Sequence, residues 1–268
     1  MRRYRLVGIL SSLLLAAGAA LGGAAAANAA GTAASGGYVA LGDSYSSGVG
    51  AGSYIASSGD CKRSTKAHPY LWAAANSPTS FDFTACSGAR TGDVLAGQLG
   101  PLSSSTGLVS ISIGGNDAGF ADVMTTCVLQ SDSVCLSRIA TATSYVDSTL
   151  PGNLDGVYSA IRSKAPNARV VVIGYPRFYQ LGTSCIGLSE TKRKAINDAS
   201  DRLNNTIAKR AANHGFAFGD VRTPFTGHEI CSGSAWLHSV NWLNIGESYH
   251  PTAVGQSSGY LPVLNSRA

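Results

Sequence analysis

A short polar stretch at the end of an apolar run contains the first residues that could do chemistry. The run 38–41 is apolar, and Gly42, Asp43 and Ser44 follow it directly. Small polar residues at a strand end usually make a turn, but such a turn can also expose a serine nucleophile. A serine hydroxyl reacts at neutral pH only with a base within hydrogen-bond reach, a group that orients the base, and donors for the oxyanion. A base, an orienting group and oxyanion donors must therefore come from other parts of the sequence.

Three other places in the sequence carry residues that fit these roles. His250, in "ESYHP", is the candidate base. The candidate oxyanion donors are the backbone N–H groups of Ser44 and Gly88 and the side-chain amide of Asn116. Gly88 has no side chain to block a substrate, and Asn116 follows two glycines, which let the backbone come close. Each signal is weak alone, but together they indicate acyl transfer at a serine.

These four residues are placed by an alternation of strand and helix patterns. Five short runs rich in β-branched or aromatic residues predict strands at 38–44, 81–86, 108–115, 169–176 and 216–221. Helical patterns lie at 68–76, 91–99, 135–166 and 189–215, the third divided near Pro151. The alternation predicts an α/β fold, a three-layer α/β/α, flavodoxin-like domain with a five-stranded parallel sheet. Ligands bind at the carboxyl ends of such strands, and Ser44, Gly88 and Asn116 each lie at the end of a predicted strand or just after it.

The N-terminus predicts export from the cell. "MRRYR" is a positive segment, a long apolar run follows it, and "ANA" at 27–29 fits a small-residue cleavage site. The apolar run is also long enough for an uncleaved membrane anchor. Its Ala- and Gly-rich second half and the cleavage pattern favour a signal peptide over 1–29 that is cleaved. A single secreted, extracellular domain over 30–268 then remains.

Charge and cysteine content narrow the class of protein further. Three arginines and no acidic residue leave with the signal peptide, so the formal charge falls from +5 to +2, too little to indicate nucleic acid binding. Six cysteines in a secreted chain predict three disulfides, although spacing alone leaves their pairing open. No Cys-x-x-Cys pair is present, so neither a zinc ribbon nor a thioredoxin-like site is indicated. We expect no metal and no cofactor.

The four candidate residues lie in motifs that resemble the SGNH (GDSL) hydrolases. "GDSYSSG", "ACSGART", "IGGND" and "YHP" match the family's blocks, and the match spans nearly the whole mature chain. The resemblance implies a nucleophile at Ser44, oxyanion donors at Ser44, Gly88 and Asn116, and a base at His250. "YVALGDSYSSG", "GYPRF" and the six-cysteine layout are more narrowly similar to the family's secreted streptomycete lipases and phospholipases. That likeness implies the disulfides Cys61–Cys86, Cys127–Cys135 and Cys185–Cys231.

The group that orients His250 departs from the family pattern. The family usually has Asp three residues before the histidine, where this chain has Glu247. One interpretation is a triad whose carboxylate is one methylene longer. The other is a dyad in which the main-chain carbonyl of Ser248 accepts the Nδ1–H bond. We favour the carbonyl, because the Glu247 side chain would have to fold back to reach the ring.

Other residues compete for a role in the site. "GQSSG" at 255–259 fits the nucleophile elbow, but no strand pattern precedes it and no histidine follows it. His68 is expected at the surface or in a helix cap, and His238 in loop packing. Apolar residues near the motifs are expected to cover the core or to bind an acyl chain. They are Tyr54, Ile55, Trp236, Leu237, Trp242, Leu243 and Ile245.

The sequence thus predicts a secreted serine ester hydrolase that forms an acyl-enzyme on Ser44. The resemblance implies a lipase that acts on carboxylic esters of lipids, with phospholipase A and broad esterase activity as extensions. The alternatives are a carbohydrate acetyl esterase of the same fold and, in another class, a non-catalytic secreted binding domain. As partners we expect a lipid or other ester substrate and transient contact with a lipid interface, but no nucleic acid. We expect a monomer.

Overall fold

The computed structural model describes residues 36–268, and the predicted signal peptide over 1–29 lies outside the described residues. Five strands form one parallel sheet in the order β2-β1-β3-β4-β5. They are β1 (Gly37–Gly42), β2 (Phe81–Phe83), β3 (Thr106–Ser112), β4 (Arg169–Ile173) and β5 (Ala217–Gly219). Each strand overlaps one predicted run, so the predicted five-stranded parallel sheet is confirmed.

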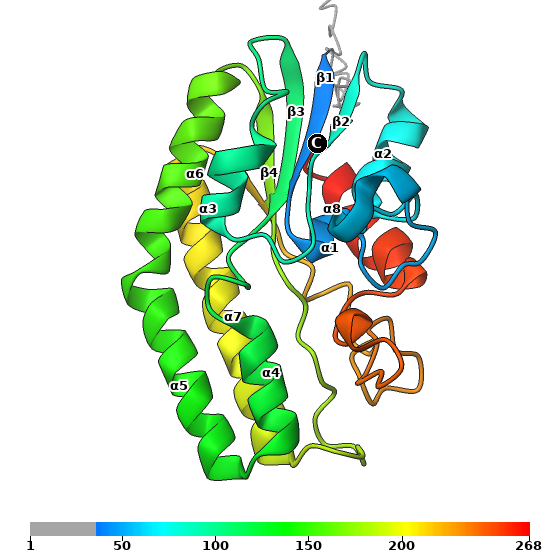
Figure 1. Ribbon diagram of the computed structural model, residues 1–268, viewed down its shortest axis with the longest axis vertical. Coiled ribbons are helices and arrows are strands. Elements are labelled where there is room, and N and C mark those ends of the chain that lie inside the picture. Colours follow the sequence, from blue (N-terminus) through cyan, green and yellow to red (C-terminus); the bar gives the residue numbers. More distant parts are fainter. Residues whose placement is uncertain (1–35) are drawn as a thin grey trace, which may run out of the picture. The chain divides into compact units, whose positions relative to one another are not determined.

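Helices cover both faces of this sheet, as Figure 1 shows for α5, α6 and α7 on one side and α2 and α8 on the other. The α-helices are α1 (Ser44–Ser47), α2 (His68–Asn76), α3 (Thr91–Asp93), α4 (Phe120–Leu129), α5 (Asp132–Ser148), α6 (Leu150–Lys164), α7 (Glu190–Asn213) and α8 (Leu261–Asn265). Shorter helical segments are η1 (Ala56–Cys61), η2 (Val94–Gln98), η3 (Ile245–Glu247) and η4 (Gly255–Tyr260). Within residues 36–268, we find no helix with the length and apolar character needed to span a membrane.

The central strands β1 and β4 are apolar along most of their length. All six residues of β1 are buried, and Val171, Val172 and Ile173 of β4 are fully buried. A parallel strand covered by helices on both faces has no side that faces water, so the apolar residues do not alternate with polar ones. The three-layer architecture thus follows from the composition of the strands.

The helix predictions agree with the structure in most places. Helix α2 begins at His68 and ends at Asn76, as predicted, and the predicted 135–166 segment divides between α5 and α6 beside Pro151. Helix α7 begins after Ser189, whose side chain accepts a hydrogen bond from the backbone N–H of Lys192. Helix α4 was not predicted, although it later proves to line the site.

The prediction for His68 is wrong. This side chain is completely buried, and its Nδ1 lies 2.8 Å from Oε1 of Gln256. Its ring stacks on Tyr260 with 5.0 Å between the ring centroids. Burial lowers the pKa of His68 to about 4, so the ring is neutral in the core at neutral pH. The partner lies far away in the sequence, which is why a local pattern could not reveal it.

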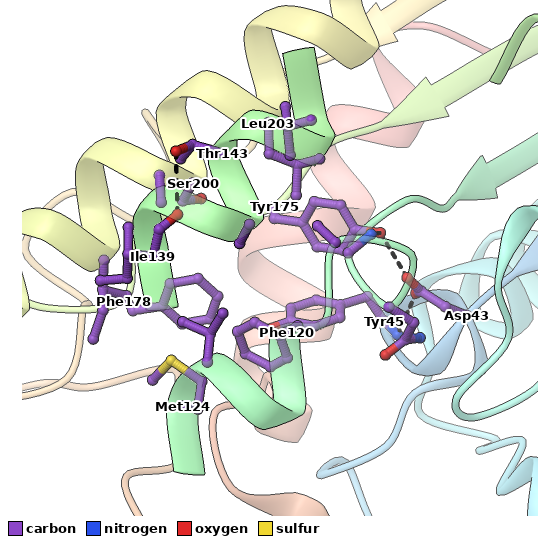
Figure 2. Close-up of a pocket in the computed structure, with 18 of the residues that line it drawn as sticks. Asp43, Tyr45, Phe120, Met124, Ile139, Thr143, Tyr175, Phe178, Ser200 and Leu203 are labelled. Atoms are coloured by element: carbon purple, nitrogen blue, oxygen red, sulfur yellow. Dashed lines mark hydrogen bonds between the residues drawn. The ribbon is translucent and has the colours of Figure 1, made fainter. Parts of the chain in front are cut away.

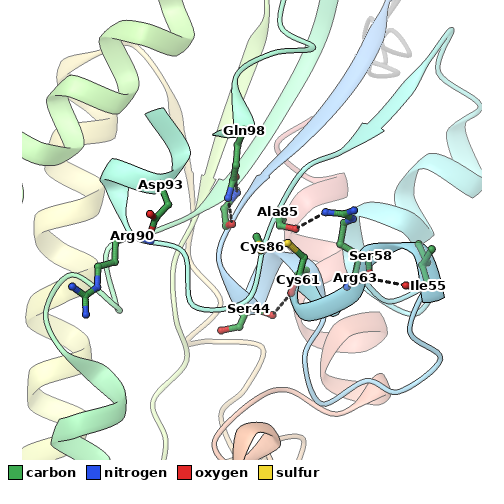
Figure 3. Close-up of a disulfide and its surroundings, with 12 residues drawn as sticks. Ser44, Ile55, Ser58, Cys61, Arg63, Ala85, Cys86, Arg90, Asp93 and Gln98 are labelled. Carbon is green, nitrogen blue, oxygen red and sulfur yellow. Dashed lines mark hydrogen bonds between the residues drawn. A yellow bond between two sulfur atoms is a disulfide. The ribbon is translucent and has the colours of Figure 1, made fainter. Parts of the chain in front are cut away.

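Three disulfides join Cys61 to Cys86, Cys127 to Cys135 and Cys185 to Cys231. These are the pairs that the family resemblance implies. Figure 3 shows the first of them close to Ser44, where it ties the end of η1 to the loop after β2. The backbone N–H of Ser87 also donates to the carbonyl of Cys61 at 3.1 Å. The loop that carries Gly88 is therefore fixed at its base.

Candidate active site

A tight turn at the end of β1 presents Ser44 at the carboxyl edge of the sheet. Gly42 ends the strand with φ +119°, and a Cβ there would lie 2.4 Å from the carbonyl oxygen of Ser112. Only glycine fits such a position. Asp43 then caps α1, its Oδ1 accepting a 2.9 Å hydrogen bond from the backbone N–H of Tyr45. Ser44 is thereby the first residue of a helix that starts where the strand stops.

His250 faces Ser44 directly. Nε2 of His250 lies 2.7 Å from Oγ of Ser44, and Nδ1 lies 3.0 Å from the carbonyl oxygen of Ser248. A carbonyl can only accept, so a neutral ring carries its proton on Nδ1 and offers the lone pair of Nε2 to the serine hydroxyl. This is the tautomer that a general base for Ser44 requires.

The surroundings keep this imidazole neutral. Burial lowers the pKa of His250 to about 4, opposed by the hydrogen bond to Ser248 and assisted by the nearby positive charge of Lys62. Above this pH the ring accepts a proton from Ser44 without first having to lose one. The site is therefore set up for base catalysis over the neutral range.

The side chain of Glu247 is directed elsewhere. Its Oε1 accepts a 2.7 Å hydrogen bond from the hydroxyl of Tyr54, and that hydroxyl accepts from the backbone N–H of Gly50 at 2.9 Å. The carboxylate thus holds the loop after α1, while the carbonyl of Ser248 occupies the partner position at the ring. Of the two orienting groups expected from the sequence, the geometry favours the carbonyl.

The two other candidate donors lie on the loops after β2 and β3. Gly88 has φ +78°, and a Cβ placed on it would meet no atom within 4 Å, so the space beside its backbone is open. Nδ2 of Asn116 donates a 3.0 Å hydrogen bond to the carbonyl of Ala89. A side-chain amide has two N–H groups, so the second remains for another acceptor. The bond to Ala89 also ties the Asn116 loop to the Gly88 loop.

The buried carboxyl group of Asp43 takes part in hydrogen bonds that link the Ser44 turn to the Asn116 loop. The hydroxyl of Tyr175 donates a 2.6 Å hydrogen bond to Oδ2 of Asp43 and accepts one from the backbone N–H of Gly115 at 3.2 Å. Burial raises the pKa of Asp43 to about 7, although the hydrogen bonds from Tyr175 and the backbone of Tyr45 oppose the shift. The chain Asp43–Tyr175–Gly115 connects the residue before the nucleophile to the residue before Asn116.

A cavity leads away from Ser44 and Asn116 into the protein between α4, α5 and α7. Figure 2 shows it extending from Asp43 and Tyr45 at one end toward Ile139 and Thr143 at the other. Most of its walls are apolar. The apolar lining residues are Ala118, Phe120, Val123, Met124, Ile139, Ala142, Val146, Phe178, Ile196, Ala199 and Leu203.

None of the loop residues that the sequence suggested for an acyl-chain surface lines this cavity. Leu237 is buried, whereas Trp242, Leu243 and Ile245 are exposed by 70%, 100% and 62%. For these last three, core cover is the wrong interpretation. The residues that do line the cavity could not be predicted from the sequence, because apolar side chains at helical spacing on α4, α5 and α7 look like ordinary core positions.

The fold and the arrangement of Ser44, His250 and Asn116 are those of a serine hydrolase. The model of the GDSL-like Lipase/Acylhydrolase family matches residues 40–257 of the chain. The chain belongs to this family, and it is a carboxylic ester hydrolase.

Two kinds of relative support this assignment. The chain is 84% identical to Lipase 1 of Streptomyces coelicolor over 268 residues, which cover all of both chains. The crystal structure of phospholipase A1 from Streptomyces albidoflavus NA297 superposes with a TM-score of 0.87 at 69% identity, covering 88% of this chain and all of that one. The extracellular lipase of Streptomyces rimosus gives 0.85 at 68% identity, covering 87% and 100%.

Proposed function

We propose that the chain is a secreted lipase, with phospholipase A activity, that cleaves carboxylic esters of lipids through an acyl-enzyme on Ser44. The observation that carries the proposal is the 2.7 Å contact between Oγ of Ser44 and Nε2 of His250 at the mouth of an apolar cavity. A nucleophile with its base at one end and an apolar channel beside it suits an ester whose acyl part is a hydrocarbon chain.

The reaction proceeds in two halves. His250 takes the proton of the Ser44 hydroxyl while Oγ attacks the ester carbonyl, and the oxyanion accepts hydrogen bonds from the backbone of Ser44 and Gly88 and from Nδ2 of Asn116. The imidazolium then gives its proton to the leaving alcohol as the C–O bond breaks. In the second half His250 takes a proton from water, which attacks the acyl-enzyme, and returns that proton to Ser44.

In this proposal a backbone carbonyl replaces the acidic member of a triad. The Ser248 carbonyl holds the Nδ1 proton at 3.0 Å and so fixes the ring, but it brings no full negative charge to the imidazolium. The Glu247 carboxylate has a structural role, holding Tyr54. The catalytic pair is accordingly a dyad of Ser44 and His250.

The acyl chain occupies the cavity between α4, α5 and α7. Each methylene that leaves water for such a pocket contributes about 0.8 kcal/mol, so the apolar walls favour long acyl chains over acetyl groups. An acetyl group is too short to contact most of these apolar walls, so the cavity does not favour a carbohydrate acetyl esterase. The relative described as phospholipase A1 supports phospholipids as a second substrate class.

Export is part of the same proposal. The signal-like segment 1–29 lies ahead of the domain, three disulfides brace its loops, and one relative of known structure is described as extracellular. Disulfides form and persist outside the reducing cytoplasm. We infer that the mature enzyme acts outside the cell.

The test is a series of p-nitrophenyl esters of increasing chain length, alongside a phosphatidylcholine and an acetylated xylan. We expect kcat/KM to rise with chain length and the phospholipid to be cleaved, with little acetate released from the xylan. The Ala142→Phe variant narrows the cavity and should reduce cleavage of the long esters about tenfold, while the acetate ester is unaffected. A preference for acetylated xylan would overturn the lipid assignment.

A further inference from the structure

In the segment 241–248, which leads into His250, the side chains of Asn241 and Ser248 are hydrogen-bonded to the segment's own backbone, whereas its apolar side chains are exposed. Oδ1 of Asn241 accepts from the backbone N–H groups of Leu243 and Asn244 at 3.1 and 3.2 Å, and Oγ of Ser248 accepts from that of Asn241 at 2.8 Å. These bonds fix the backbone. Trp242, Leu243 and Ile245, here called the apolar tip, are meanwhile exposed by 70%, 100% and 62%.

Folding alone gives no reason for this arrangement. Three large apolar side chains within four residues expose hydrocarbon to water, and such a grouped surface marks an interaction site more often than a single exposed leucine does. Tryptophan in particular prefers the boundary between water and hydrocarbon, where its ring is buried and its N–H stays solvated. The apolar tip therefore has the composition of a segment that enters a lipid surface.

A positive charge lies beside the apolar tip. A Cβ placed on Gly246 would lie 3.5 Å from Nζ of Lys62, so the ammonium group is next to the residue that follows Ile245. Within residues 36–268 no carboxylate comes within 4.0 Å of this ammonium. The nearest acid along the tip, Glu247, is engaged by Tyr54. Charge and apolar surface together match an assembly that has anionic headgroups above hydrocarbon.

The apolar tip is also continuous with the rim of the active site. It is followed by Ser248 and His250, and Tyr249 between them packs edge-on against Phe120 of the cavity wall, with 6.4 Å between ring centroids. Figure 1 shows this part of the chain as the orange segment beside the blue loop that follows α1. A lipid surface into which the apolar tip is inserted would thus lie near the cavity that a lipid molecule must enter.

We propose that Trp242, Leu243 and Ile245 insert into the surface of an anionic phospholipid assembly while Lys62 contacts its phosphate groups. The proposal rests on the proposed function, since it assumes that the ester substrate is drawn from a lipid surface. It assigns the docking step to residues outside the catalytic machinery, and the acyl cavity then receives a single chain from the surface.

The test uses vesicles of non-hydrolysable diether lipids, one set phosphatidylglycerol and one set phosphatidylcholine, and measures the bound fraction of the mature enzyme by sedimentation. We expect the wild type to bind the anionic vesicles more tightly. Replacing Trp242, Leu243 and Ile245 with Ser should weaken binding to both sets at least tenfold. Lys62→Gln should weaken binding about fivefold to the anionic set alone.

A matched control is Leu95→Ser, because Leu95 is a 45% exposed leucine that follows α3, away from the apolar tip. This variant should bind as the wild type does. Hydrolysis of soluble p-nitrophenyl acetate should be unchanged in the tip variant, which shows that the protein is folded and the active site intact.

The two proposals fail separately. Wild-type vesicle binding by the tip variant, with acetate hydrolysis intact, overturns the docking proposal and leaves the proposed function in place. A wild-type dimer in sedimentation velocity that the tip variant dissociates also overturns it, because a second copy then covers the surface. Absence of ester hydrolysis by folded wild type overturns the proposed function.

Discussion

The hydroxyl of Tyr45 donates a 2.7 Å hydrogen bond to the backbone carbonyl of Tyr249, so the residue after the candidate nucleophile holds the residue before the candidate base. Tyr249 has φ +68°, a left-handed conformation that costs a non-glycine residue on the order of 1 kcal/mol. That conformation turns the chain so that the carbonyl of Ser248 reaches Nδ1 of His250. The bond from Tyr45 stabilises the turn.

Tyr45→Phe should therefore disturb the alignment of His250 more than the binding of substrate. We expect kcat on a p-nitrophenyl ester to fall roughly ten- to a hundredfold, the range for a small misplacement of a catalytic group, with little change in KM. The matched control is Tyr179→Phe, which removes a 3.2 Å bond to the side-chain hydroxyl of Tyr249 and leaves its carbonyl untouched. Equal losses in the two variants would show that the Tyr45 bond does not position the base.

Glu247→Gln separates the dyad from a triad. Gln keeps an acceptor for the hydroxyl of Tyr54 but has no charge to give to the imidazolium. If the Ser248 carbonyl alone orients His250, turnover should stay within a few-fold of wild type, as measured by steady-state kinetics with circular dichroism as a check of folding. A loss of about a thousandfold or more in a folded protein would instead assign Glu247 to a triad.

Asn116→Ala removes one oxyanion donor. The amide reaches the cavity beside Ser44 and is held by its bond to Ala89. We expect kcat to fall about a hundred- to a thousandfold with a small change in KM, since the oxyanion exists only after attack. A near-wild-type kcat would remove Asn116 from the oxyanion site.

The pH dependence of kcat/KM reports the base in the free enzyme. His250 must be neutral to accept a proton, and burial lowers its pKa to about 4. Activity should be lost as the pH falls through about 4 and should be flat from about pH 5 upward into the neutral range. A stopped-flow pH-jump assay, short enough to precede acid unfolding, measures this. An inflection near 6.5 would mean that the ring titrates as it does in water.

The sequence predicts where the candidate oxyanion donors and the candidate nucleophile lie, because their signals are local. The strands lie in runs rich in β-branched or aromatic residues, and Ser44, Gly88 and Asn116 lie at or just beyond the ends of such runs, where parallel strands converge on one edge of the sheet. His250 was identified by its motif. The contact between Ser44 and His250 is implied by the family resemblance, because no local pattern places residue 250 beside residue 44.

What could not be predicted depends on partners that are distant in the sequence. His68 is buried because Gln256 accepts its hydrogen bond 188 residues away. The cavity is lined by side chains from α4, α5 and α7 together, and the sequence of no single helix records it. The sequence leaves two expectations for Leu243, core cover or contact with an acyl chain, yet its side chain is fully exposed and lies outside the cavity.

Labelling the mature enzyme with a long-chain alkyl phosphonate, and locating the adduct by mass spectrometry, tests whether Ser44 is the nucleophile and His250 its base. We predict one adduct per chain, on the peptide that contains Ser44, formed far more slowly in His250→Ala and absent in Ser44→Ala. No adduct on the folded enzyme, or an adduct on another serine such as Ser257, would show that Ser44 is not the nucleophile.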